Sequence, residues 1–379
     1  MRKLVLILAL LLISTPSWAI DKFARGGGGN WTTDATWSTT SGGAADTTAP
    51  TSTDAAILDG NSGAVNVDAT SVAQSLDCTG YISTLAFSTN DVLTVSGSVT
   101  FVSGMTLTMS AVSGATLTMA ATGSLTTAGK SLRNLIIDAT GGTVTLVDGV
   151  TTVSANITVT NGTIKMDGAA DNSGLIHSIN GLTSSNTNTR TITMGNSTVS
   201  LNSSSAPLTF ANGTLTFNAG TSTLIVTDTG AGTKTFAGGG HTFATVQITG
   251  SGTGQVTFTG NNTYANLPQV VSGTKTIGIA SGSTQTFTGG TDFGNGTNRV
   301  TITSATQHTL SKSSGVVNAG YLTLTNSSAI GGAVWNCLNN CVDNGGNSGW
   351  IFPSAGRSGS GRNRNIITMA PRSRLIYAP

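Results

Sequence analysis

Acidic and histidine side chains are the residues with which this chain could do hydrolytic chemistry, and they are few and scattered. All 15 acidic residues are Asp. Glycoside hydrolysis usually needs two carboxylates across one bond, and the closest pairs along the sequence are Asp167 with Asp171 and Asp54 with Asp59. The first pair lacks the alternating acidic spacing and terminal Glu of a dedicated calcium loop. We therefore interpret it as a plain turn.

The three histidines, His177, His241 and His308, belong to separate repeats, and we expect them at the surface or in turns. No Gly-x-Ser-x-Gly elbow, phosphate-binding loop or metal-spaced His pair accompanies them. We assign no catalytic residue, no cofactor and no metal ligand, and expect a protein that is not an enzyme. A carbohydrate-active β-helix enzyme stays an alternative, because Asp residues isolated in sequence could meet in space.

The chain contains three cysteines. In an exported protein, Cys337 and Cys341 could close a small disulfide loop and leave Cys78 unpaired. Three inert thiols are the alternative. Three Cys without a nearby His make a poor zinc site.

Threonine pairs of the form Thr-x-Thr offer a more specific activity, because ice-binding solenoids present one such pair per rung on a flat face. Within a strand the two Thr point to the same side. The chain has many such pairs, and eight of them begin 10, 27, 15, 33, 23, 43 and 44 residues apart, at Thr106, Thr116, Thr143, Thr158, Thr191, Thr214, Thr257 and Thr301. We expect such uneven spacing to scatter the pairs around the molecule. The sequence therefore predicts no strong ice binding.

The elements that must carry these residues are strands. Only 8% of the 379 residues are charged, whereas 67 Thr, 43 Ser and 50 Gly make up more than two fifths of the chain. Helical bundles and coiled coils need Glu, Lys, Leu and Ala in quantity, and Glu is absent. Segments such as 115–119, 190–194 and 321–325 alternate an aliphatic residue with Thr, which is typical of a strand with one buried face.

These strands recur every 15 to 30 residues between Gly, Asn, Ser and Asp turns. One such repeat cannot bury its apolar face alone, so repeats of this kind stack into a solenoid. We predict an all-β fold, a single elongated parallel β-helix or solenoid with capped ends. β-Sandwich repeats are the alternative; they would need turns every 8–12 residues and large core aromatics.

The tryptophans mark the expected ends of the rod, because an open sheet end needs protection. Trp31 and Trp37 lie near its start, and Trp335 and Trp350 near its finish. We predict a signal peptide over 1–19, an N-terminal cap over 20–61, the solenoid over 62–328, a C-terminal cap over 329–352 and a tail over 353–379. An aromatic platform that binds carbohydrate is the alternative role for the four Trp.

The two termini differ in charge and in predicted role. A basic start, an apolar run over 4–13 and small residues before position 20 are typical of a secretory signal, so we expect a secreted or cell-surface protein without a transmembrane segment. Residues 357–379 carry a charge of +5, and residues 20–356 carry −5. The tail is a candidate partner-binding arm or a solvated extension. Its candidate contact residues are Arg362, Arg364, Arg372, Arg374 and Tyr377.

Three stretches carry a resemblance to a known class of proteins. They are Gly29 to Trp37 with the Pro50 to Leu58 segment, residues 234–254, and residues 310–352 with their Asp-Asn-Gly-Gly-Asn-Ser-Gly-Trp ending. They resemble secreted repetitive β-helix proteins of the adhesin and autotransporter-passenger type, including uncharacterised phage-associated proteins. The resemblance implies an exported interaction role and carries over no catalytic residue.

Together these observations predict an exported, non-enzymatic structural or adhesive rod. Its expected partners are a glycan or cell-envelope surface, or other copies of itself. Nucleic acid is not expected, because the five tail Arg are not accompanied by a basic folded face. A phage-type receptor-binding fibre is a further alternative.

Overall fold

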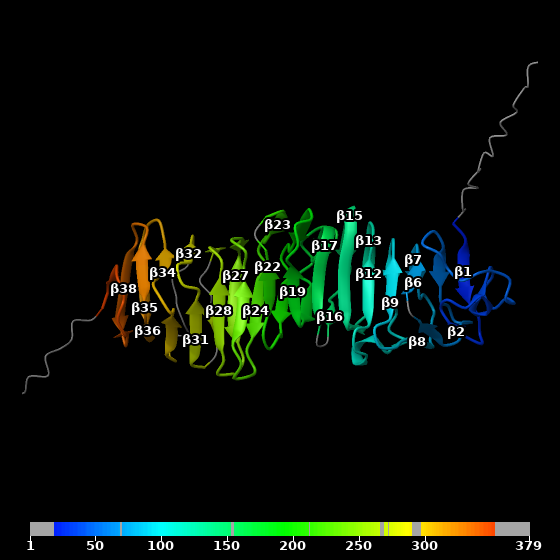
Figure 1. Ribbon diagram of the computed structural model, residues 1–379, viewed down its shortest axis with the longest axis horizontal. Coiled ribbons are helices and arrows are strands. Elements are labelled where there is room, and N and C mark those ends of the chain that lie inside the picture. Colours follow the sequence, from blue (N-terminus) through cyan, green and yellow to red (C-terminus); the bar gives the residue numbers. More distant parts are fainter. Residues whose placement is uncertain are drawn as a thin grey trace, which may run out of the picture.

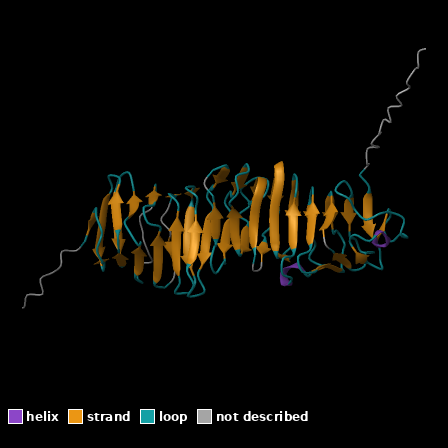
Figure 2. Ribbon diagram, viewed as in Figure 1, coloured by secondary structure: helices purple, strands orange, loops and turns teal. Residues whose placement is uncertain are grey.

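The chain folds into one elongated all-β rod (Figure 1). It is described from a computed structural model, with 49% strand and 2% helix in a parallel β-solenoid of about 12 turns. The structure describes residues 19–68, 70–152, 155–211, 213–265, 269–271, 273–289 and 297–352. Figure 2 shows strands along the whole rod and helix only in short pieces. The predicted solenoid is confirmed, and the β-sandwich alternative is wrong.

One ladder of parallel strands runs almost the full length of the rod, and we call it ladder 1. Its members are β6 (Thr70–Ala73), β9 (Val92–Val95), β12 (Thr116–Met119), the first halves of β15 (Asn134–Leu146) and β17 (Asn156–Lys165), β19 (Gly181–Ser184), β22 (Leu208–Phe210), β25 (Lys234–Ala237), β28 (Gln255–Thr259), β31 (Lys275–Ile279), β33 (Val300–Thr303), β36 (Leu322–Leu324) and β39 (Val342–Asp343). Each turn of the solenoid therefore contributes one strand to this wall.

The second wall is built from two ladders in succession. Ladder 2 holds β1 (Asp21–Ala24), β4 (Ala55–Ile57), β7 (Ser75–Asp77), β10 (Val99–Thr100), β13 (Gly123–Thr126), the second halves of β15 and β17, β20 (Arg190–Thr193) and β23 (Leu215–Asn218). Ladder 3 holds β26 (Thr242–Phe243), β29 (Thr263–Tyr264), β32 (Thr284–Phe287), β34 (His308–Ser311) and β37 (Ser327–Ile330). The change from ladder 2 to ladder 3 falls between β23 and β26.

The third wall consists of three shorter ladders. The first is β2 (Gly29–Asn30), β5 (Val65–Val67), β8 (Thr84–Phe87) and β11 (Thr106–Leu107). The second is β14 (Ser131–Leu132), β16 (Thr151–Thr152), β18 (Ile176–Ile179), β21 (Thr198–Leu201), β24 (Thr223–Thr227), β27 (Thr245–Thr249) and β30 (Gln269–Val270). The third is β35 (Val316–Gly320), β38 (Val334–Asn339) and β40 (Trp350–Ile351).

The core is a set of inward columns that the pairing register keeps aligned from turn to turn. On ladder 1, eight successive inward side chains are at most 1% exposed: Leu93, Leu117, Leu135, Ile157, Leu182, Leu208, Phe236 and Phe258. Their spacing varies, from 18 residues between Leu117 and Leu135 to 28 between Leu208 and Phe236. Loops of different length absorb this variation, because the strands pair in register whatever the loop between them.

The two ends of the rod are built differently. At the N-terminal end, the 3-10 helix η1 (Asp34–Thr36) leads into β3 (Trp37–Ser38), which pairs antiparallel with β1. Among the described strand pairs, β1 with β3 is antiparallel and the others are parallel. Residues 329–352, for which we expect a cap, continue the parallel pairing through β38, β39 and β40. A second 3-10 helix, η2 (Met109–Ala111), lies in the third wall after β11.

Candidate binding surface

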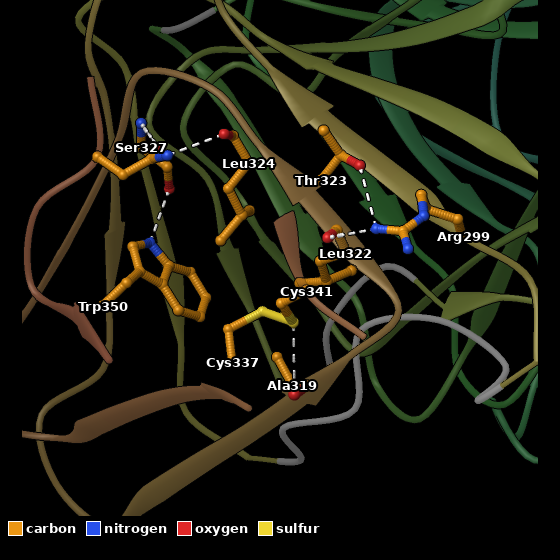
Figure 3. The surroundings of a disulfide bond; sticks show 10 residues. Arg299, Ala319, Leu322, Thr323, Leu324, Ser327, Cys337, Cys341 and Trp350 are labelled. Carbon is orange, nitrogen blue, oxygen red and sulfur yellow. Dashed lines mark hydrogen bonds between the residues drawn. A yellow bond between two sulfur atoms is a disulfide. The ribbon is translucent and has the colours of Figure 1, made fainter. Parts of the chain in front are cut away.

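Of the two alternatives for the cysteines, the structure shows the disulfide. Cys337 at the end of the rod is bonded to Cys341, whose Sγ lies 3.8 Å from the carbonyl oxygen of Ala319 (Figure 3). The bond closes the short loop that joins β38 to β39. Cys78 is a free, buried thiol, and burial raises its pKa.

This arrangement predicts the thiol count of protein produced under oxidising conditions. In denaturant without reductant, a thiol reagent should find one reactive cysteine per chain, and after reduction it should find three. The native protein should react slowly, since the remaining thiol is buried with a raised pKa. The variant Cys78→Ser should show none before reduction. Three reactive thiols in unreduced protein would contradict the disulfide.

The four tryptophans are packing residues. The rings of Trp31 and Trp37 lie 5.1 Å apart, edge to face, and both side chains are at most 1% exposed. Trp335 is also buried and lies 5.1 Å from the half-buried Trp350. An aromatic platform for sugars needs exposed ring faces, so that alternative is wrong. An edge-to-face Trp pair at each end instead belongs to the core or packs against it.

Two of the three histidines lie in the core, which corrects the expectation of surface or turn positions. His177 is fully buried; its Nδ1 accepts a hydrogen bond from the Val150 amide at 3.1 Å, and its Nε2 lies 2.6 Å from the Met166 carbonyl. His308 is fully buried as well, and burial lowers its pKa to about 4. His241 is half-buried after a Gly-rich turn. His177 and His308 occupy inward positions of strands that alternate buried and exposed residues. That alternation predicts their burial, although histidine is a polar residue that we expected at the surface.

The carboxylates of Asp167 and Asp171 bond to their own loop and to the next turn of the solenoid. Asp167 is buried and accepts hydrogen bonds from the amides of Ser173, Leu175 and Asn196 at 2.8–3.0 Å. Asp171 forms an ion pair with Lys165 at 3.1 Å. The carboxylates of Asp54 and Asp59 likewise accept hydrogen bonds within their own turns. Within the described part of the chain, no three His, Cys or Asp side chains gather as a metal site would require.

Aligned threonines are the feature of the outer surface that the sequence reasoning misjudged. On ladder 1, an outward column of nine paired positions holds Thr at six of them: Thr94, Thr118, Thr158, Thr183, Thr209 and Thr259. As expected, the Thr-x-Thr pairs are divided among the walls, with Thr106 on the third wall, Thr116 on ladder 1 and Thr143 on ladder 2. Within one ladder, however, threonines align despite their uneven spacing, because strand register, and not residue count, decides alignment.

The most continuous array lies on ladder 2, and we call it the threonine face. On four successive strands, the residues Thr143, Thr163, Thr191 and Thr216 pair with one another and point outward. A second column beside it holds Thr145, Lys165, Thr193 and Asn218. With rungs about 4.8 Å apart, the four threonines span roughly 14 Å.

Two depressions flank the threonine face. One, of about 350 Å³, is lined by Thr140, Gly141, Gly142, Asn161, Gly162, Thr163, Asn188, Thr189 and Thr191. The other, of about 290 Å³, is lined by Asp171, Asn172, Thr193, Gly195, Asn196, Asn218, Gly220 and Thr221. Gly162 has φ +74°, and a Cβ there would lie 1.9 Å from the Ala139 carbonyl oxygen, so only glycine allows this corner. The surface offers hydroxyl and amide groups that can donate and accept hydrogen bonds.

Three basic residues in the interior escaped the sequence reasoning. Arg190, Lys234 and Lys275 are each at most 2% exposed. Each begins a strand at the inward parity, two residues before a buried Ile or Phe. A charged residue at an inward position of an alternating strand is the signal that could have found them.

Comparison of the chain with family models, with curated proteins and with solved structures finds no match. Among the described residues, no helix is long and apolar enough to cross a membrane. The candidate tail residues Arg362, Arg364, Arg372, Arg374 and Tyr377 lie outside the described residues, as does the apolar run at the start of the chain.

Proposed function

We propose that the protein is an exported, non-enzymatic rod that attaches to a glycan of a cell envelope through the threonine face. The observation that carries this proposal is the register that lines up Thr143, Thr163, Thr191 and Thr216 between two amide-lined depressions. A polymer of repeating hydroxyl-rich units can exchange hydrogen bonds with such a row at each rung. The signal-like N-terminal sequence supports export.

Glycan arrays and pull-down with purified envelope material test the proposal. The double variant Thr163→Ala/Thr191→Ala removes two adjacent hydroxyls of the threonine face, and we expect binding to weaken by about tenfold. Thr198→Ala/Thr223→Ala makes the same change on paired positions of the third wall and serves as the matched control. Equal loss in both variants, or turnover of a polysaccharide by the unaltered protein, would overturn the proposal.

Ice is a ligand that we expect the threonine face not to bind strongly. The two columns are aligned, but not every strand has Thr in both. β17 has Lys165 in the second column, between the pairs Thr143/Thr145 and Thr191/Thr193. A hydrated ammonium group in the row prevents a flat match to a crystal. Thermal hysteresis should therefore be absent. A clear freezing-point depression that disappears in Thr143→Leu/Thr145→Leu would contradict this prediction.

A further inference from the structure

The second wall of the solenoid is interrupted where ladder 2 ends and ladder 3 begins. β23 closes ladder 2 and β26 opens ladder 3, and among the described strands no backbone pairing joins them. The inward Phe217 of β23 is half-buried and not fully covered, unlike the inward residues of neighbouring strands. The inward side of β23 is therefore incompletely covered at this break.

Arg190 points inward beside the break without a counterion. It pairs with Leu215 of β23 and is 1% exposed. Its Nη1 donates to Oδ1 of Asn186 at 2.8 Å, while Nε and Nη2 are buried and have no partner. None of the ion pairs in the described chain includes Arg190. A buried cation without a partner is costly, and burial lowers the pKa of this guanidinium.

His241 lies on the other side of the break. Its ring centroid is 5.8 Å from that of Phe210 and 6.0 Å from that of Phe217, and its buried Nε2 has no partner. Burial, and then the charge of Arg190, lower the pKa of His241. Strand β23 thus has the unsatisfied Arg190 paired with its Leu215 on one side, and the unsatisfied His241 against the ring of its Phe217.

The free nitrogens of Arg190 have the geometry of a specific receptor. Nε and Nη2 form one edge of the planar guanidinium, and that edge matches both oxygens of a carboxylate in a bidentate pair. Asn186 fixes the plane, since its own Nδ2 donates to the Thr160 carbonyl at 3.0 Å. The single positive charge of Arg190 balances one negative charge, which favours a carboxylate over a phosphate dianion.

We propose that Arg190 and His241 form a binding site for a small carboxylate, with Phe210 and Phe217 contacting the apolar part of the ligand. Asn186, Phe217 and His241 are half-buried, so the site has a side toward solvent. It is distinct from the threonine face, because Thr191 points outward from the strand whose Arg190 points inward. The site therefore goes beyond the proposed attachment function and is tested independently of it.

Titration calorimetry with sodium acetate and sodium glucuronate, at constant ionic strength, tests the site. We expect saturable binding in the millimolar range or tighter. Arg190→Met should abolish binding, and Arg190→Lys should weaken it by about tenfold or more, because an ammonium lacks the two-pronged edge. His241→Gln should weaken it severalfold. Arg133→Gln, a half-buried Arg on a different rung, is the control and should bind normally.

Several results would overturn the proposal. They are no saturable carboxylate binding, equal affinity in Arg190→Met, or tighter binding of sulfate or phosphate than of carboxylate. Arg190→Met should fold, because it removes an uncompensated charge and keeps apolar volume. If it does not fold, His241→Gln decides, and unchanged affinity there contradicts the site. Loss of glycan attachment in Thr163→Ala/Thr191→Ala with unchanged acetate binding would separate the two proposals.

Discussion

Replacing Asp228 by Asn is expected to lower the free energy of unfolding by about 3–5 kcal/mol, because it leaves two buried lysines unpaired. Asp228 follows β24 and is fully buried. Its Oδ1 lies 2.6 Å from Nζ of Lys234 and its Oδ2 lies 2.8 Å from Nζ of Lys275. The lysine side chains are 2% and 1% exposed, so water cannot replace the lost carboxylate. Urea unfolding followed by far-UV circular dichroism measures the loss.

A surface ion pair supplies the matched control. Asp171→Asn removes the partner of Lys165 at 3.1 Å, where the side chains are 29% and 32% exposed. Exposed pairs contribute about 0–1 kcal/mol, so this variant should unfold near the unaltered protein. Equal destabilisation by both substitutions would contradict the assignment of Asp228 as the partner of two buried charges.

Removing all three charges together distinguishes pairing from packing. The variant Asp228→Leu/Lys234→Met/Lys275→Met leaves no charge unpaired, and such replacements are often neutral or stabilising by about 1–4 kcal/mol. We therefore expect the triple variant to be at least as stable as the unaltered protein. A triple variant as unstable as Asp228→Asn would show that this part of the core is stabilised by the polar groups themselves, and not by the balance of their charges.

Low pH should remove the stabilisation that the ionised Asp228 carboxylate provides. Burial alone would raise the pKa of Asp228, but hydrogen bonds and charges from Lys234 and Lys275 outweigh it and hold the pKa below its usual range. A carboxyl with a depressed pKa stabilises the fold above its unfolded pKa of about 3.9, and the gain is lost as pH falls through the folded value. The difference in melting temperature between the unaltered protein and Asp228→Asn should therefore shrink below about pH 4.

The composition and the alternation of Thr with aliphatic residues were enough to predict the solenoid, because both follow from the chemistry of a half-buried strand. The pairing register of the strands could not be predicted from the sequence. The solenoid turn from Leu208 to Phe236 takes 28 residues, and the turn from Leu117 to Leu135 takes 18. In both, the first and last residues pair in register on adjacent strands. Alignment is decided by strand pairing after loops have absorbed the extra residues, and spacing along the sequence does not report it.

The candidate sites show the same limit. The disulfide partners were visible in the sequence because Cys337 and Cys341 are close together. Asp228 stands in a Thr- and Gly-rich turn, and Lys275 lies 47 residues beyond it, so only the stacking of turns brings the two together. Arg190 and His241 are likewise far apart in sequence and lie on turns on either side of β23.

Replacing Trp37 by Ala is expected to have an effect of similar size at the N-terminal end. Trp37 is fully buried, and its Nε1 donates to the carbonyl of Trp31 at 2.7 Å. Loss of a buried aromatic ring costs about 3–5 kcal/mol, and the Trp31 carbonyl would lose its donor. Because β3 is the strand that pairs antiparallel with β1 at this end, loosening it also uncovers a parallel edge.

Unfolding in a solenoid spreads between neighbouring turns, so a weakened end should fray first and expose strands that pair with other molecules. We expect Trp37→Ala to show both a lower urea midpoint by circular dichroism and light scattering at concentrations where the unaltered protein stays clear. Trp350→Ala is the comparison at the other end. Trp350 is half-buried, so we expect a smaller loss of about 1–3 kcal/mol there. Equal losses, with no scattering from Trp37→Ala, would show that the antiparallel end does not protect the rod from association.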